Sequence, residues 1–358
     1  MPRLDVGSII AGSAIAIPPR VVTNHDLEQI MDTTDDWIVS RTGVRQRHMA
    51  DPGVGSSDLA TDAVLAAVSN AGTTVDEIDL LVMATMTPDQ FAPGPAPLVQ
   101  DKAGLGHVAA FDIRQQCGGF LFGLDLADAY LSTGRARRAV VVGAEVHTGY
   151  LPYGDSGFAR LRGGTGEVSS SDRAAATEAR GWAVLFGDGA GAMVLEPNDD
   201  DDVGFIASRL HSDGSHFDLI QVVGAGFAHQ PYIDAAQLEA RMHWPQMNGL
   251  ELFRQAVRRM PESVEEVLVD TALTVADIDV LIAHQANARI LQGVQRQLGI
   301  AEKRVVNVIE RFANTTAGTL PIAFHERRGS AGIDSGDLVA FTAFGAGAHW
   351  GAMLYRAP

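Results

Sequence analysis

The sequence contains one cysteine in 358 residues. A single cysteine cannot form a disulfide within the chain, so folding does not call for an oxidising compartment. Long apolar runs are also missing: AVVVGA at 139–144 is far shorter than the about 20 residues of a membrane-spanning helix. The opening stretch MPRLDVGSIIAGSAIAIPPR lacks a basic region followed by a long apolar run. We therefore expect no signal peptide and a cytoplasmic protein.

Positive charge is scarce. The chain has 27 Lys and Arg against 44 Asp and Glu, a net charge of -17. Such a chain repels backbone phosphates, so we expect no nucleic-acid partner. The glycine-rich GDGAG at 187–191 lacks the Lys-Ser/Thr pair of a phosphate-binding loop and runs into an apolar stretch. We interpret it as a tight turn.

Apolar residues make up 46% of the chain, and there are 38 glycines. A chain of this length exceeds the usual size of one core, so two domains or two packed halves are expected. Apolar β-branched runs alternate with helical patterns, which predicts strands buried on both faces by helices. The fold class is α/β, with strands expected at 80–85, 138–145, 183–197, 280–284 and 337–345.

The two halves of the sequence resemble each other. VDEIDLLVMA at 75–84 returns as VADIDVLIAH at 275–284. FDIRQQCGGFLFGLDLADAY at 111–130 corresponds to VIERFANTTAGTLPIAFHER at 308–327, which places Cys117 on Asn314. Chance similarity is the alternative for the first match alone. We predict two duplicated halves, residues 1–197 and 198–358.

Three polar residues fall where such halves would meet. Cys117 precedes a probable helix, where free N–H groups are expected to lower the pKa of its thiol. His284 ends a buried strand at which the first copy has Ala84. Singly, Cys117 could be an inert buried residue, His284 a structural histidine and Asn314 a helix cap. Together they predict a Cys-His-Asn catalytic site in the cleft between the halves.

Seven motifs in order extend this pattern over nearly the whole chain. With them the sequence resembles the β-ketoacyl-acyl-carrier-protein synthase III family of the thiolase superfamily. That family has a thiolase-like fold of two similar halves in a five-layer αβαβα arrangement, and its members are usually homodimers. The motifs are TTDDWIVSRTGVRQRH (33–48), DIRQQCGGFLFGL (112–124), FGDGAGAMVLEP (186–197), MNGLELFRQAV (247–257), HQANARI (284–290), NTTAGTLPIA (314–323) and FGAGAHWGAMLYR (344–356).

The resemblance implies a role for each matching residue. Cys117 attacks an acyl-CoA and holds the acyl group, while His284 and Asn314 bind the malonyl thioester on acyl carrier protein as carbon dioxide leaves. The amides of Cys117 and Ala346 form an oxyanion hole, although relatives commonly have glycine at Ala346, and alanine is strained there if φ is positive. Phe344 packs beside the cysteine or is simply a core aromatic. No metal and no cofactor besides the CoA and carrier-protein substrates is implied.

The resemblance also implies a CoA site and a docking site. Trp37 and Arg180 match a pair that sandwiches adenine, and Arg41 matches a residue near the nucleotide. Trp37 could instead pack between helices. Arg254 and Arg289 match basic positions that meet the phosphopantetheine arm or the acidic carrier protein, and singly each could be a solvated charge.

Two departures from the family leave the primer open. Residues 151–181 are longer and richer in Gly and Ser, and we interpret them as an inserted mobile loop near the entrance or the dimer interface. Gln115 and Gln116 stand where small residues are commoner before the nucleophile. Acetyl-CoA is therefore not assumed: primer, extender and pathway remain open.

The favoured function is decarboxylative condensation of an acyl-CoA with malonyl-acyl carrier protein, in the biosynthesis of fatty acids or of related polyketides or specialised lipids. The alternative is an acyltransferase of the same fold that acts on a hydroxyl or amine. Such relatives tend to have another residue at the position of Asn314. A non-catalytic partner subunit tends to lose the nucleophile, which is present. A reverse thiolase needs a second cysteine, which the chain does not have.

Overall fold

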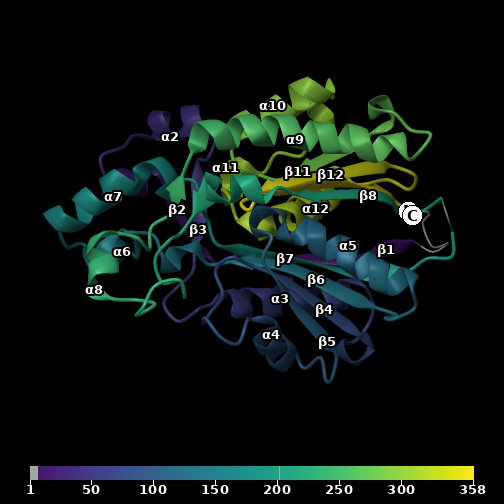
Figure 1. Ribbon diagram of the computed structural model, residues 1–358, viewed down its shortest axis with the longest axis horizontal. Coiled ribbons are helices and arrows are strands. Elements are labelled where there is room, and N and C mark those ends of the chain that lie inside the picture. Colours follow the sequence, from purple (N-terminus) through teal and green to yellow (C-terminus); the bar gives the residue numbers. More distant parts are fainter. Residues whose placement is uncertain (1–6, 201) are drawn as a thin grey trace.

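Two mixed sheets form the framework of the protein (Figure 1). The computed structural model describes residues 7–200 and 202–358, so residues 1–6 of the opening stretch lie outside the described part. The first sheet has the order β1 (Ser8–Ala16), β7 (Gly189–Pro197), β6 (Ala139–Glu145), β4 (Leu80–Ala84), β5 (Ala109–Ile113). The second has the order β8 (Gly204–Ser212), β13 (His349–Arg356), β12 (Leu338–Gly345), β11 (Val280–Ala283).

Helices cover both faces of each sheet. The first sheet packs outward on α3 (Ser56–Asn70) and α4 (Ala96–Ala103), and the second on α9 (Gly249–Val269) and α10 (Ala288–Leu298). Between the sheets lie α5 (Gly119–Ser132) and α12 (Thr319–Ser330), whose apolar side chains pack on both sheets. Figure 1 shows the resulting five layers, with α9 and α10 in the upper outer layer and α3 and α4 in the lower one. The expected αβαβα arrangement is confirmed.

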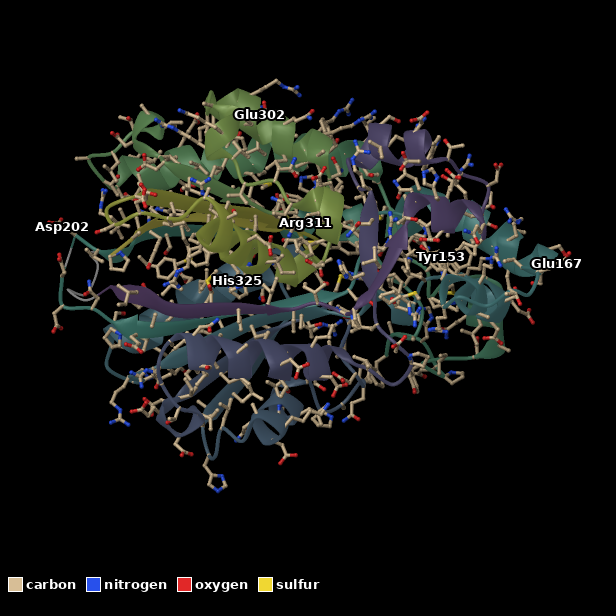
Figure 2. All side chains as sticks on the ribbon, turned by 180° about the vertical axis from the view of Figure 1, so that it is seen from behind. Tyr153, Glu167, Asp202, Glu302, Arg311 and His325 are labelled. Carbon is tan, nitrogen blue, oxygen red and sulfur yellow. The ribbon has the colours of Figure 1, made fainter. Side chains whose placement is uncertain are left out.

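The strands β4, β6, β11 and β12 each have a parallel neighbour and are fully buried, which explains their continuous apolar runs. β4 pairs in parallel with β5 and β6, and β11 pairs in parallel with β12. β7 and β13 then return antiparallel to β6 and β12. In the central layer, Ser13 Oγ on β1 lies 3.1 Å from His325 Nδ1 on α12. Figure 2 shows His325 between the sheets.

The two halves repeat each other, but in one place with a different register from the one expected. The 3-10 turns Val75–Glu77 and Val275–Asp277 precede β4 and β11, as the first match predicts. The turn Gln116–Gly118 before α5 corresponds to Thr316–Gly318 before α12, and both begin with a residue of positive φ, +52° and +41°. The alignment of Cys117 with Asn314 is therefore wrong: Cys117 corresponds to Ala317, because Asn314 lies in the loop before the turn.

A lobe beside the layers carries the remaining helices. It is built around a separate apolar cluster to which α2, α6 and α7 contribute, and it includes the buried Tyr153, labelled in Figure 2. The remaining helices, in the lobe and elsewhere, are α1 (Asn24–Glu28), α2 (Asp35–Thr42), α6 (Gly154–Leu161), α7 (Ser170–Ala183), α8 (Ala235–Glu239) and α11 (Ile309–Phe312). Two short strand pairs complete the structure: β2 (Arg20–Thr23) with β3 (Gln46–Met49), and β9 (Ile220–Gln221) with β10 (Gln246–Met247).

Two expectations about this region are wrong. Residues 151–181 are largely helical, as α6 and most of α7, instead of a mobile loop. The side chain of Ser169 caps α7 by accepting a hydrogen bond from the Asp172 amide, and the helix buries Ala176, Ala179 and Ala183. The strand expected from residue 183 begins only at Gly189, because α7 runs to Ala183. Small residues here serve helix packing.

No helix in the described part of the chain is long and apolar enough to cross a membrane.

Candidate active site

Cys117 lies where β5 leads into the central helix α5. Its turn begins with Gln116 at φ +52°, a conformation that is uncommon outside glycine and that concentrates at functional sites. A Cβ atom on Gly345 would lie 2.6 Å from the Gln115 carbonyl oxygen and 3.1 Å from the Cys117 nitrogen. Glycine at the end of β12 therefore lets the second half contact the backbone of the cysteine directly.

The thiol of Cys117 is buried, with 9% of the residue exposed. Burial, followed by the negative charge of Glu145, raises the pKa of this thiol to about 12. The expectation of a lowered pKa is therefore wrong for the resting site, because the favourable contact with the Cys117 amide is smaller than the cost of burying a thiolate. The thiol of Cys117 is therefore protonated at pH 7 in the resting site.

His284 directly follows β11 and is also buried, with 3% exposed. Burial lowers the pKa of its imidazole to about 3, so the ring is neutral at pH 7. Its Nδ1 lies 2.7 Å from Thr319 Oγ1, and that hydroxyl donates to the Thr316 carbonyl oxygen over 2.8 Å. Since a hydroxyl has one hydrogen, this pattern assigns the imidazole proton to Nδ1 and leaves Nε2 as an acceptor.

Asn314 is fixed by backbone and side chain together. Its amide donates to the Leu185 carbonyl oxygen over 2.9 Å, and its own carbonyl oxygen accepts from Gly187 over 3.1 Å. Its Oδ1 accepts from the Thr316 amide over 2.8 Å, which is the capping role considered above. The Nδ2 group has no partner among the residues that the structure describes. One end of the side chain is thus structural, and the other remains free to donate to a ligand.

Glu145 at the end of β6 is a residue that the sequence analysis missed. It is fully buried, and its carboxylate accepts from the Met86 and Thr87 amides over 3.1 Å and from the Ala317 amide over 3.4 Å. Burial still raises the pKa of Glu145 to about 7. A polar residue ending a buried strand was the signal that led to His284, and the same signal points to Glu145. It ties the loop after β4 to the turn before α12.

Ala346 follows β12 and is not among the described residues with positive φ. The alanine is therefore unstrained there. The Ala346 amide donates no hydrogen bond to the described residues, and the Cys117 amide contacts its own thiol. Their joint role as an oxyanion hole stays a prediction. Phe344 is buried and stacks on Trp350, with ring centroids 6.4 Å apart. Phe344 is thus part of the apolar core, while its contact with an acyl group stays a prediction.

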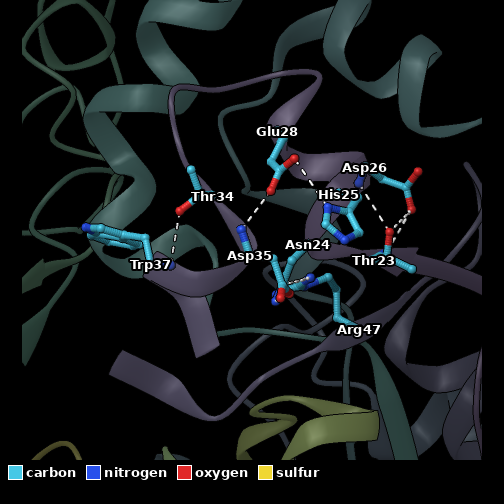
Figure 3. Close-up of polar contacts among 9 residues, drawn as sticks. All are labelled: Thr23, Asn24, His25, Asp26, Glu28, Thr34, Asp35, Trp37 and Arg47. Carbon is cyan, nitrogen blue, oxygen red and sulfur yellow. Dashed lines mark hydrogen bonds and ion pairs between the residues drawn. The ribbon is translucent and has the colours of Figure 1, made fainter. Parts of the chain in front are cut away.

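The three residues expected at CoA come together in space. The guanidinium carbon of Arg41 lies 4.5 Å, and that of Arg180 5.0 Å, from the centroid of the Trp37 ring. Trp37 is held at the start of α2, where its amide donates to Thr34 Oγ1 over 3.1 Å, as Figure 3 shows. Behind it, Asn24 accepts from the buried Arg47 over 2.8 Å (Figure 3). An adenine ring would have to enter between Trp37 and one arginine.

The two docking arginines lie on neighbouring outer helices. Arg289 at the start of α10 donates to the Ser40 carbonyl oxygen of α2 over 2.8 Å, so it lies beside the Trp37 helix. Arg254 on α9 is exposed and is 3.6 Å from Glu251. Within the described chain, no cluster of three or more His, Cys, Asp or Glu could hold a metal ion.

Two similar halves in five layers, with a buried cysteine on the turn before a central helix, define a protein of the thiolase-like class. Comparisons with known proteins agree. The family model for 3-oxoacyl-[acyl-carrier-protein] synthase III matches residues 111–168 and 165–214. The model for the C-terminal part of the same family matches residues 268–357. The chain belongs to the β-ketoacyl-acyl-carrier-protein (3-oxoacyl-acyl-carrier-protein) synthase III family, whose members are enzymes.

Individual relatives cover the whole chain. The β-ketoacyl-acyl-carrier-protein synthase III of Erythrobacter litoralis is 40% identical over 353 residues, which are 98% of this chain and 99% of the relative. The crystal structure of the Aquifex aeolicus synthase III is 34% identical with a TM-score of 0.83, covering 98% of this chain and 100% of that one. The priming β-ketosynthase of the R1128 polyketide pathway is 28% identical with a TM-score of 0.81, covering 98% and 97%.

Proposed function

We propose that the protein is an acyltransferase of the synthase III type that condenses an acyl-CoA with malonyl-acyl carrier protein, with loss of carbon dioxide, through an acyl-Cys117 intermediate. The observation that carries this assignment is the divided side chain of Asn314. Its Oδ1 accepts from the Thr316 amide, and its Nδ2 is left to donate; the Thr316 carbonyl oxygen in turn accepts from the Thr319 hydroxyl that contacts His284. Two neutral donors stabilise an enolate oxygen without removing a proton.

The first half-reaction transfers the acyl group. Cys117 Sγ attacks the thioester carbonyl, His284 Nε2 takes the thiol proton, and the amides of Cys117 and Ala346 stabilise the oxyanion. The carbon–sulfur bond to CoA then breaks, and the proton passes to the departing CoA sulfur. Since the high pKa of Cys117 makes a standing thiolate scarce at pH 7, the thiol proton has to leave in the course of the attack.

The second half-reaction makes the carbon–carbon bond. The malonyl thioester oxygen accepts from Asn314 Nδ2 and His284 Nε2 as the bond to the carboxylate breaks and carbon dioxide leaves. The enolate carbon attacks the acyl-Cys117 carbonyl, and the Cys117 thiolate departs and is reprotonated. For His284 Nε2 to donate, the ring must take its other neutral tautomer: Nδ1 gives its proton to solvent, Nε2 takes one from solvent, and the Thr319 hydroxyl turns from the Thr316 oxygen to donate to Nδ1.

The substrates and the assembly belong to the same proposal. Trp37, Arg41 and Arg180 take the nucleotide of CoA, while Arg254 and Arg289 take the phosphopantetheine arm or the acidic carrier protein. The similarity to both fatty-acid synthases III and a polyketide priming enzyme supports either pathway. A homodimer, a cytoplasmic location and the division of the chain at residues 197 and 198 stay predictions.

Mass spectrometry of the purified protein with acyl-CoAs of two to twelve carbons tests this function. We expect a Cys117-bound acyl group with acyl-CoA alone, and a β-ketoacyl-carrier product only when malonyl-acyl carrier protein is added. Acylation without carbon–carbon bond formation would instead favour the acyltransferase that uses a hydroxyl or amine acceptor. No acylation by any donor would reject both assignments.

A further inference from the structure

Arg47 on β3 is a buried charged residue that the proposed reaction does not use. Its guanidinium donates to the carbonyl oxygens of Val22 and Val184 and to Oδ1 of Asn24, while its Nε has no partner in the described chain. Burial lowers the pKa of Arg47 to about 10, so the group is still charged at pH 7. A buried charge is costly unless hydrogen bonds compensate for it, so these three partners have to stay in place.

One of these bonds holds the end of α7. Arg47 Nη2 donates over 3.0 Å to the carbonyl oxygen of Val184, the residue that follows and caps this helix. A cation is favourable at this end of a helix, because the last carbonyl groups carry partial negative charge. Arg180, whose guanidinium lies over Trp37, belongs to the last turn of the same helix. Arg47 therefore anchors the helix that carries Arg180.

A second bond leads to α2 through Asn24, as Figure 3 shows. Asn24 Oδ1 accepts from Arg47 Nη1 over 2.8 Å. Asn24 Nδ2 donates over 2.8 Å to Asp35 Oδ1 in the first turn of α2, and over 2.8 Å to the Val44 carbonyl oxygen beyond its end. An amide accepts at one end and donates at the other, which suits it to join a cation to a carboxylate. Trp37 lies between these two attachment points.

An exposed contact joins the same two helices. The amide of Asp32, before α2, donates to Thr177 Oγ1 of α7 over 2.9 Å, and Arg180 donates to the Asp32 carbonyl oxygen. Water competes for these exposed groups, whereas Arg47 and Asn24 are buried. Hydrogen bonds are stronger in the low dielectric of the interior, so the buried pair has the larger part in fixing how α2 and α7 are spaced.

We propose that Arg47 and Asn24 are positioning residues for the nucleotide of CoA, because they hold Trp37 on α2 at a set distance from Arg180 on α7. The inference rests on the proposed function, which places the adenine ring between the tryptophan and one arginine. Two stacking faces that are already spaced before binding lose less freedom when the ring enters. Neither residue has a part in the thioester chemistry, so loss of the network should weaken CoA binding without slowing the reaction at Cys117.

Asp35→Ala tests this, because it cuts the link between Asn24 and α2 at a partly exposed residue. We expect the Kd for CoA, measured calorimetrically, to rise by about 3- to 10-fold, which is part of the about 2- to 30-fold that loss of a stacked contact costs. The KM for acyl-CoA should rise in the same way. The acyl thioester of N-acetylcysteamine, which lacks the nucleotide, should acylate Cys117 at the wild-type rate. Asp35→Asn keeps an Oδ1 acceptor and should bind CoA as wild type does.

Asp36→Ala is the matched control. Asp36 is the next residue in the same first turn of α2 and is exposed, so its loss changes the local charge by the same amount outside the network. This variant should bind CoA as tightly as wild type. The double variant Trp37→Ala with Asp35→Ala gives a second measurement: if Asp35 acts through Trp37, its loss raises the Kd no further once the ring is gone.

The outcomes distinguish this inference from the proposed function. An unchanged Kd in Asp35→Ala, an equal rise in Asp36→Ala, or additive effects of Asp35→Ala and Trp37→Ala would each overturn the inference and leave the condensing function intact. Slower acylation of Asp35→Ala by the N-acetylcysteamine thioester would show a general structural role, and would also overturn it. Failure of every thioester to acylate Cys117 in wild type would overturn the proposed function, and this inference with it.

Discussion

The Nδ1 atom of His284 lies 2.7 Å from the Thr319 hydroxyl oxygen, which is in turn 2.8 Å from the Thr316 carbonyl oxygen. This chain of three polar groups links the end of β11 to the first turn of α12, across the contact between the second sheet and the central layer. It decides which imidazole nitrogen of His284 is protonated, and hence whether Nε2 can accept or donate.

Thr319→Val removes the hydroxyl and keeps the shape of the side chain. We expect the condensation rate to fall by about 10- to 100-fold, the range found when a group that orients a functional histidine is lost. The pH dependence of kcat/KM should shift as well, because the tautomer is no longer fixed. Thr319→Ser restores the hydroxyl and should recover most of the activity. Equal activity of the Val and Ser variants would exclude this positioning role.

Asn314→Ala separates the two half-reactions. Acylation of Cys117 should be largely retained, while condensation should fall by about 10²- to 10³-fold, as when an oxyanion-hole donor is removed. Asn307→Ala is a control, since Asn307 Oδ1 accepts from the Ile309 amide over 3.3 Å without contacting the site. Both steps are measured on the same samples by mass spectrometry. A parallel loss of acylation in the Asn314 variant would contradict the division of roles.

Glu145→Gln should change how stability depends on pH. The pKa of Glu145 is raised from 4.5 to about 7, and those of His147 and His284 are lowered from 6.5 to about 4 and about 3. Between about pH 4.5 and 6.5 the unfolded chain binds more protons at both histidines, so they destabilise the fold as pH falls. Glu145 binds its proton in the folded state and acts in the opposite direction.

Each group changes the free energy of unfolding by about 1.4 kcal/mol per pH unit in this range. The two histidines make the protein more stable as pH rises and Glu145 makes it less stable, so the net slope of the three is about that of one histidine. In Glu145→Gln the opposing contribution is gone, and the slope should be about twice as steep. Urea denaturation of wild type and variant at several values in this range measures it. Parallel pH profiles for the two proteins would show that Glu145 does not titrate with a raised pKa.

Trp37→Ala should weaken CoA binding. A cation–π or stacked contact contributes about 0.5–2 kcal/mol, so we expect the Kd for CoA, measured calorimetrically, to rise by about 2- to 30-fold. Arg135→Ala removes a similar contact, that of Arg135 over Tyr130 at 4.7 Å, at the far end of α5. That control should leave the Kd unchanged. An unchanged Kd for CoA in Trp37→Ala would show that the nucleotide does not bind at α2.

Much of the fold follows from local patterns. Strands buried on both faces are apolar along most of their length, so β4, β6, β11 and β12 can be recognised in the sequence as short apolar runs. The repeated VDEIDLLVMA and VADIDVLIAH segments fix two equivalent units, because the same residues make the same turn and strand. A polar residue at the end of such a strand identifies His284, and by the same reasoning identifies Glu145.

Other features depend on contacts between segments far apart in the chain. The register of the second match was set at an offset of 197 residues, whereas the structure keeps the offset of 200 that the first match already has and so brings Cys117 onto Ala317. Residues 151–181 contain many small residues, but Ala176, Ala179 and Ala183 form a buried helix face only because the lobe covers them. Composition alone cannot distinguish that helix from a loop.

The sequence by itself thus determined the α/β class and the duplication, and it predicted Cys117, His284 and Asn314 as the site, because period, length and side-chain chemistry are local properties. The tertiary structure alone decided the protonation of that site. The raised pKa of Cys117 and the tautomer of His284 both arise from burial and from partners brought together by folding. These depend on the electric environment, which no stretch of sequence contains.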